Sequence, residues 1–150
     1  MAPGDWEAVR AMRLAALADA PSSFESTLER ELELDESAWR GRLVRAITLQ
    51  AWSDDRALGM LTVVQDDEGS DTAQVTGLWV EPASRGRGVA AALMDEAARC
   101  WAGAGGRRLR LWVVGANAAA QRLYAAQGFA PTGRSGEFRG LPEIELSRAV

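Results

Sequence analysis

The residues best suited to chemistry lie in a short segment rich in glycine and arginine, Ser84–Gly88. An alternating apolar run ends just before it, at Glu81 and Pro82, and an apolar periodicity typical of a helix begins just after it. Glycines at such a junction let backbone N–H groups approach an anion, and the helix dipole adds partial positive charge there. The junction therefore predicts a pyrophosphate site, although Gly86 and Gly88 would equally suit a plain tight turn.

A second phosphate chemistry fits the same glycines less well. Gly86–Ala91 matches the glycine spacing of dinucleotide sites, which is a weak pattern by itself. A nicotinamide site would place an acidic residue about 20 positions later, at the end of the next strand. The chain has Arg107, Arg108 and Arg110 in that region, and two helices and three strands are expected before the loop. A dinucleotide site is therefore disfavoured.

Three features of the composition narrow the chemistry further. The chain has no histidine and, since all 17 basic residues are arginine, no lysine. This excludes the usual Ser-His-Asp and Cys-His nucleophiles, Schiff-base chemistry and a Walker-type phosphate loop, and it removes the commonest zinc ligand, so we expect no metal. The only cysteine, Cys100, lies on an apolar helical stripe and is interpreted as inert packing in a reducing compartment.

The elements that must position the junction alternate between helical and strand periodicity. Two helical regions come first, the second carrying Leu28, Leu32, Trp39 and Leu43, and Asn117 is well placed to cap the last helix. We expect strands at 47–52, 58–64, 73–80, 109–114, 129–132 and 144–146, and later helices starting near Val89 and Asn117. This order predicts an α/β or α+β layer with a mixed sheet covered by helices.

The length, composition and net charge of the chain predict its domain number, location and partners. At 150 residues, with 47% hydrophobic and 25% charged residues, the chain is expected to fold as a single domain over 1–150. No apolar stretch is long enough for a membrane span and no secretory signal is evident, so a cytoplasmic protein is expected. The net charge of -4 argues against nucleic acid and suits a cationic substrate.

Two blocks of the sequence resemble the motifs of one superfamily. Arg85-Gly86-Arg87-Gly88-Val89-Ala90 fits the [Gln/Arg]-x-x-Gly-x-[Gly/Ala] signature of the GNAT acyl-coenzyme A dependent N-acetyltransferases. Downstream, Asn117 to Phe129 resembles Asn-x-x-Ala-x-x-Leu-Tyr-x-x-x-Gly-Phe. The resemblance extends over about residues 45–133. It implies a mixed, mostly antiparallel sheet with splayed fourth and fifth strands, flanked by about four helices.

The resemblance also implies an acetyl-coenzyme A site. The pantetheine arm would pair with the open edge of the family's fourth strand, and a backbone N–H there would stabilise the thioester oxyanion. Amides of the glycine-rich turn would hold the pyrophosphate, Arg85, Arg87 or Arg122 could pair with the 3'-phosphate, and Asn117 could contact the cofactor as well as cap its helix. The expected cofactor-binding residues are Leu78, Trp79, Val80, Arg85, Gly86, Arg87, Gly88, Val89, Ala90, Asn117 and Tyr124.

Proton transfer has one strong candidate and several weaker ones. Tyr124, the only tyrosine, would stay protonated at neutral pH and could donate to the departing thiolate, although a packed ring is the alternative interpretation. For the general base we select Glu81 at the strand end, and Glu25, Glu31, Glu143 or an ordered water stay open. Some relatives that modify protein N-termini carry a glutamate where this chain has Trp112. Trp52 and Trp79 could wall a substrate pocket.

The predicted function is transfer of an acetyl group from acetyl-coenzyme A to a primary amine by direct attack in a ternary complex. The amine could be a small molecule or belong to a peptide or protein, and no nucleic acid or membrane partner is expected. A non-catalytic acyl-coenzyme A binding regulatory module is the alternative. Members of the superfamily usually begin with a strand, whereas only Met1–Gly4 precede the first helix here. Either that edge strand is missing or the true start lies upstream; a missing strand would leave a sheet edge uncovered and could favour a homodimer.

Overall fold

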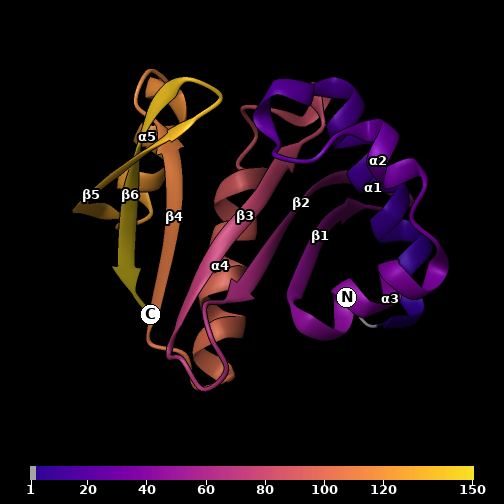
Figure 1. Cartoon of the computed structure of the whole chain (residues 1–150), viewed down its shortest axis with the longest axis horizontal. Helices are drawn as coiled ribbons and strands as arrows, with labels where there is room; N and C mark the ends of the chain where they lie inside the picture. The colour runs from indigo at the N-terminus through magenta and orange to yellow at the C-terminus, as the bar shows by residue number, and fades with distance from the viewer. Residues whose placement is uncertain (1–2) are drawn as a thin grey trace.

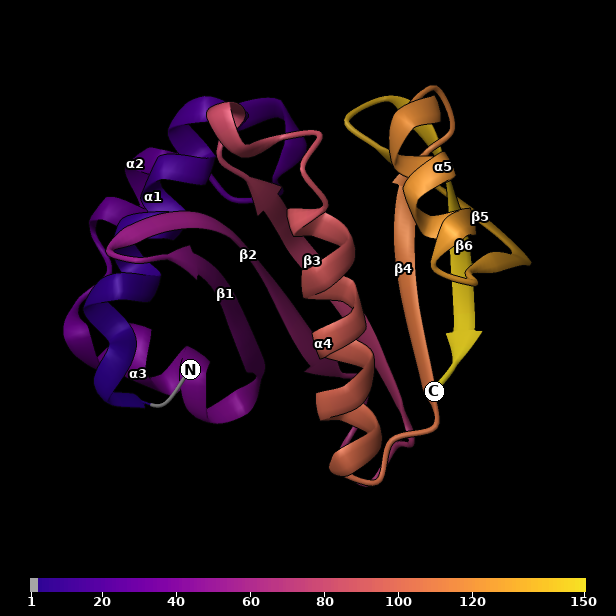
Figure 2. The same cartoon turned by 180° about the vertical axis from the view of Figure 1, so that it is seen from behind.

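The computed structural model describes residues 3–150 and consists of one mixed sheet with helices on both faces (Figures 1 and 2). The helices are α1 (Trp6–Asp19), α2 (Leu28–Leu32), α3 (Glu36–Arg45), α4 (Val89–Gly103) and α5 (Ala118–Ala126). The strands are β1 (Ile47–Ser53), β2 (Arg56–Gln65), β3 (Thr72–Val80), β4 (Arg108–Val114), β5 (Ala130–Phe138) and β6 (Leu141–Ala149). No helix in the described part of the chain is long and apolar enough to cross a membrane.

The sheet has the order β1-β2-β3-β4-β6-β5, and every neighbouring pair is antiparallel except β3 and β4. This confirms the expected fold class. The second helical region is two helices rather than one, because Asp35 accepts a hydrogen bond from the Ala38 backbone N–H at 2.9 Å and starts α3 anew. Residues 3–150 therefore contain five α-helices where about four were expected.

The two faces of the sheet carry separate cores. On one face, α4 and α5 cover Leu61, Val75, Leu111 and further apolar residues of the central strands. On the other, α1 and α3 pack against Met60 and Trp79 of β2 and β3. The second face of β4, β6 and β5 has no helix over it in Figure 1. It carries the polar side chains of Arg110, Glu143 and Glu145 as well as the indole of Trp112.

The C-terminal hairpin is longer than expected. The sequence indicated only short strands at 129–132 and 144–146, but β5 and β6 have nine residues each. Almost all of β5 is exposed, because it is an edge strand whose residues contribute little to the core. Hydrophobic alternation, the main strand signal in a sequence, is therefore nearly absent from it.

β3 and β4 are paired at one end and separate at the other (Figure 1). Their register is limited to Thr72–Arg108, Ala73–Leu109 and Gln74–Arg110. At the paired end, the indole N–H of Trp101 lies 3.1 Å from the carbonyl oxygen of Arg108 and 3.3 Å from that of Asp71. One side chain of α4 thus ties together the starts of both strands, beyond which they diverge.

Candidate functional site

The diverging part of β3 presents an unpaired backbone edge. The Glu81 N–H donates to the Leu58 carbonyl at 2.8 Å, so Glu81 and, two residues earlier, Trp79 direct their backbone groups toward β2. Backbone direction alternates along a strand, so Val80 and Leu78 direct theirs toward the gap. Of the three residues expected to pair with an extended ligand, Leu78 and Val80 are therefore the two whose backbone groups face the gap, where the Val80 carbonyl already accepts a hydrogen bond from Arg85 Nε at 3.0 Å.

A bulge in β3 shapes this edge and was not foreseen from the sequence. The register between β2 and β3 shifts between Met60 and Thr62, opposite Gly77, whose φ is +64°. An L-residue rarely adopts this conformation. The isolated glycine inside a strand pattern was the signal that could have indicated the bulge.

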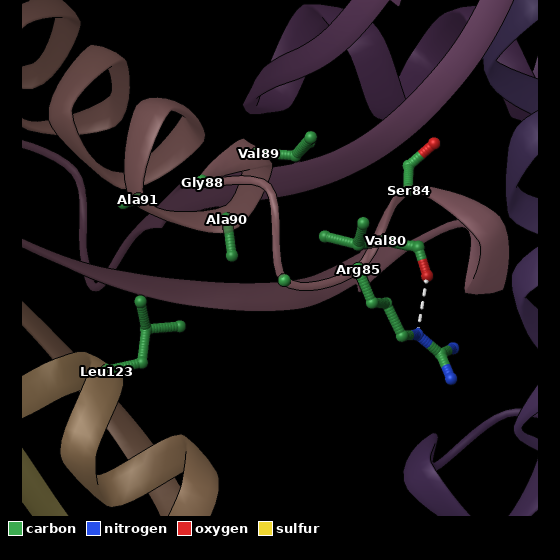
Figure 3. Close-up of a pocket in the computed structure, with 9 residues that line it drawn as sticks. Val80, Ser84, Arg85, Gly88, Val89, Ala90, Ala91 and Leu123 are labelled. Carbon is green, nitrogen blue, oxygen red and sulfur yellow. Dashed lines mark hydrogen bonds between the residues drawn. The ribbon is translucent and has the colours of Figure 1, made fainter.

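The turn between β3 and α4 forms a cradle of backbone amides beside this edge. Gly86 and Gly88 both have positive φ, at +72° and +82°, and a Cβ on either would meet no heavy atom within 4 Å. The first helical hydrogen bond of α4 runs from Ala92 to Gly88, so the preceding N–H groups have no partner within the helix. They line a cavity of about 210 Å³ whose residues are Val80, Ser84, Arg85, Gly86, Gly88, Val89, Ala90, Ala91 and Leu123 (Figure 3).

The Arg85 side chain does not point along this cradle. Its Nε donates to the Val80 carbonyl at 3.0 Å, as Figure 3 shows, and its Nη2 lies 2.6 Å from Asp19 Oδ2 at the end of α1. The same carboxylate oxygen accepts from the indole N–H of Trp79 at 2.9 Å. Hydrogen bonds from Trp79 and then Arg85 lower the pKa of Asp19. Arg85 therefore fastens the turn to α1, and its backbone rather than its guanidinium faces the cavity.

Of the other side chains expected to contact the cofactor, Asn117 is already hydrogen-bonded to a described residue, whereas Arg87 and Arg122 are not. Asn117 Oδ1 accepts from the Ala120 N–H at 3.1 Å, which confirms the capping role. Arg87 and Arg122 are exposed and have no hydrogen bond or ion pair within residues 3–150. They are the two guanidinium groups near the cradle that are free to meet a phosphate.

Tyr124 lies on α5, one residue after the cavity-lining Leu123. Its ring meets Phe129 edge-on with centroids 6.0 Å apart, and burial raises the pKa of its hydroxyl above the usual 10.0. The described residues offer this hydroxyl no hydrogen-bond partner. A phenol that stays protonated and has a free donor has the properties required of a general acid.

Glu81 is more constrained than a solvated turn residue. Its Oε2 accepts from Arg56 Nη2 and from the Ser84 hydroxyl, both at 2.8 Å. Hydrogen bonds from Arg56, and then Ser84, lower the pKa of Glu81. A carboxylate of lowered pKa is a weak proton acceptor, and these bonds brace the turn before α4. The role of Glu81 as base stays a prediction that this environment does not favour.

The remaining carboxylate candidates differ in their partners. Glu31 is buried at 1% exposure and ion-paired to Arg13 at 3.1 Å and to Arg42 at 3.2 Å. Burial raises its pKa, but these arginines outweigh burial and the net shift is downward. Glu25 is exposed on the loop before α2. Glu143 on β6 has its pKa raised, first by burial and then by the charge of Glu25.

Trp52 and Cys100, for which the sequence suggested a pocket wall and inert packing, both lie outside the cavity. Trp52 is 46% exposed on β1, two strands away from the gap, and it does not line the cavity, so its role as a pocket wall stays a prediction. Cys100 donates to Glu96 Oε1 at 3.3 Å and has no basic partner among residues 3–150. Those residues also contain no group of three or more potential metal ligands.

The fold, the open edge and the amide cradle define an acyl-coenzyme A dependent transferase, and the chain belongs to the acetyltransferase (GNAT) family. The family model matches residues 10–129. This confirms the resemblance found in the two motifs, and with it acetyl-coenzyme A as the cosubstrate. Among curated proteins, no significant match to the chain was found.

Several solved structures share this fold at low sequence identity. A GNAT family acetyltransferase from Streptococcus pneumoniae has a TM-score of 0.80 at 20% identity, over 100% of this chain and 96% of that chain. The PaiA N-acetyltransferase from Thermoplasma acidophilum, in complex with coenzyme A, has a TM-score of 0.76 at 16% identity, over 100% and 96%. Spermidine N-acetyltransferase from Vibrio cholerae, in complex with CoA and spermine, has a TM-score of 0.76 at 17% identity, over 99% and 92%.

Proposed function

We propose that the chain transfers the acetyl group of acetyl-coenzyme A to a primary amine, by direct attack in a ternary complex. The observation that carries this proposal is the separation of β3 from β4 beyond Gln74 and Arg110, which leaves the backbone of Leu78 and the N–H of Val80 without a strand partner beside the amide cradle of α4. An extended arm can add to that edge as a strand would, while its diphosphate meets the N–H groups of Val89 and Ala90.

The residues around the gap divide the chemistry between them. A backbone N–H at Leu78 or Val80 would stabilise negative charge on the thioester oxygen while the amine attacks. The Tyr124 hydroxyl, protonated because burial raises its pKa, would donate to the departing thiolate. Arg87 and Arg122 are available for the 3'-phosphate, since neither has a partner among the described residues. We place this activity in the cytoplasm, where the single cysteine would stay reduced.

A thiol-release assay tests the proposal. The wild-type chain and Tyr124→Phe would be supplied with acetyl-coenzyme A and three amines: spermidine, a peptide with a free N-terminus, and a peptide whose only amine is a lysine side chain. We expect release on at least one amine, and a loss of about 10²-fold or more in kcat for Tyr124→Phe with unchanged affinity for acetyl-coenzyme A. Ala125→Ser, a small change at an exposed position of α5 that does not line the cavity, is the control.

The assay also separates the proposed enzyme from a regulatory module. Calorimetric binding of acetyl-coenzyme A without release on any amine would contradict the proposal and favour the module. Release that is unchanged in Tyr124→Phe would remove the tyrosine from the mechanism while leaving the transferase in place.

A further inference from the structure

The side of the gap opposite α5 is bounded by a continuous set of contacts between β3 and β6, which we call the rim. Arg13 Nη1 lies 3.4 Å from where a Cβ of Gly77 would be, and the Arg13 guanidinium carbon lies 4.7 Å from the centre of the Phe24 ring. The Phe24 carbonyl accepts from Arg139 Nη2 at 2.5 Å. Arg139 belongs to the turn between β5 and β6, whose tip approaches the N-terminal helical region in Figure 1. The N-terminal region and the hairpin thus meet at the wide end of the gap.

Glu143 lies on this rim, at the wide end of the gap. It pairs with Val114, the last residue of β4, and with Gly136 of β5. A Cβ built on Gly136 would meet Trp112 Cζ3 at 3.4 Å and Glu143 Oε1 at 3.5 Å, so the indole and the carboxylate share one face of the sheet. The neighbouring Ile144 packs against the core on the other face. The carboxylate therefore lies on the face opposite the one covered by α4 and α5.

Glu143 and the exposed Glu25 have no partner among residues 3–150, unlike Glu31, Glu81 and Glu145. Within that range, Glu143 makes no hydrogen bond and no ion pair. Glu81 is bound by Arg56 and Ser84, and Glu31 is bound by two arginines. Glu145, two residues further along the same face, is bound by arginine as well. A partly buried carboxylate left unpaired in a chain of 17 arginines is suited to a cationic ligand.

The charged groups that face Glu143 set its proton affinity. Glu25, from the loop before α2, lies close enough to raise the Glu143 pKa, and burial raises it further. Glu145 is neutralised by Arg110 at 3.4 Å and Arg134 at 3.2 Å, and Arg139 is directed to the Phe24 carbonyl. A carboxylate with raised proton affinity is a better base at neutral pH than Glu81.

Given the proposed amine acetylation, we propose that Glu143 binds the acceptor's ammonium group and takes its proton, acting as the catalytic base on the rim. The acceptor class is a primary amine that arrives as a cation and carries no carboxylate next to the nitrogen, because Glu25 and Glu143 would repel one. Trp112 lies on the same face with the Arg134 guanidinium 5.7 Å from the centre of its ring, so this pair bounds the site beside Glu143.

The reaction balances in protons and bonds. The ammonium gives its first proton to Glu143, which later releases it to water, and the free amine forms a bond to the thioester carbonyl carbon. The C–S bond then breaks while the nitrogen loses its second proton to water. Tyr124 protonates the thiolate and regains a proton from water. The products are the N-acetyl amine, coenzyme A as its thiol and one proton released to solution.

The test compares Glu143→Gln with Glu137→Gln. Glu137 lies on the same hairpin, but it neighbours Gly136 in β5 and therefore faces the other side of the sheet. With the amine on which the wild-type chain is most active, we expect Glu143→Gln to lower kcat/KM by about 10²- to 10³-fold at pH 7.5. We also expect it to change the pH profile: kcat/KM of the wild type should level off once Glu143 is ionised, whereas kcat/KM of Glu143→Gln should keep rising toward the pKa of the amine, because only amine that is already unprotonated can then attack. Glu137→Gln should keep the wild-type rate and profile.

Two further measurements exclude a purely structural effect. Glu143→Gln should bind acetyl-coenzyme A as the wild type does in calorimetry. It should also melt at a slightly higher temperature at pH 7.5, because a carboxyl whose pKa is raised by folding loses stability as pH rises through that pKa. An unchanged rate, a pH profile that levels off as the wild type's does or an equal loss in Glu137→Gln would overturn the role of Glu143 and leave the transferase proposal intact. A wild type without release on any amine would overturn both.

Discussion

Gly88→Ala should change two measurable quantities, the stability of the folded chain and its affinity for acetyl-coenzyme A. Gly88 precedes α4 with φ +82°, and a non-glycine residue in left-handed conformation costs about 1–2 kcal/mol. No heavy atom lies within 4 Å of the added methyl group, so no steric term increases that cost. The melting temperature should fall by about 2–8 °C. The methyl group enters the space in front of the amide cradle, and losing one charge-assisted hydrogen bond there would weaken acetyl-coenzyme A binding by about 10- to 100-fold.

Gly105, just past the other end of α4, provides a matched control. Its φ is +90°, and it too has no heavy atom within 4 Å of a Cβ. Gly105→Ala should lower the melting temperature by a similar amount and leave the dissociation constant unchanged, because this end of the helix does not line the cavity. Calorimetric titration and a melting curve of each variant check both statements. Equal binding by the two variants would refute the assignment of the diphosphate to the turn before α4.

Two further predictions concern the residues that hold the site in place. Glu31→Gln should lower the free energy of unfolding in urea by about 2–3 kcal/mol. This is below the value for a fully buried ion pair because Arg13 and Arg42 are partly exposed. The control Glu36→Gln breaks an exposed pair with Arg40 and should lower the free energy of unfolding by less than about 0.5 kcal/mol. Because folding lowers the Glu31 pKa, its ion pairs stabilise the folded chain above the ordinary pKa of 4.5 and lose that effect as pH falls below it. The wild type and Glu31→Gln should therefore converge in free energy of unfolding toward pH 3. A difference that does not change with pH would contradict the ion pairs. Gly59→Ala should lower the free energy of unfolding by about 1–3 kcal/mol, because the added Cβ would lie 2.7 Å from the Trp79 carbonyl oxygen. The same contact would displace the open edge of β3 and so weaken acetyl-coenzyme A binding. Binding equal to that of the wild type would argue against a role of this edge.

The parts of the site that depend on neighbouring residues could be predicted from the sequence. The glycine turn, the strand before it and the Asn117 cap are local patterns, and the structure contains each of them. The family motifs rest on the same local patterns, which explains why they identified the coenzyme side of the gap.

The acceptor side depends on contacts between distant residues, and no local pattern reports them. The hydrogen bond from Arg139 to Phe24 joins positions 115 apart, and the arginines that bind Glu31 and Glu81 come from other elements. In sequence, Glu31, Glu81 and Glu143 are three similar carboxylates. Only their partners in space distinguish the two held by arginines from the unpaired Glu143.

The alternating backbone direction of β3 has a consequence for hydrogen exchange. The amide of Trp79 faces β2 and is shielded by its ladder hydrogen bond, whereas that of Val80 faces the gap. A single strand in the middle of the sheet therefore combines slowly and quickly exchanging amides at a period of two, a pattern otherwise found at the outer edges of sheets. An added strand of ligand would remove the alternation, so deuterium uptake at Val80 reports occupancy of the gap independently of any chemistry.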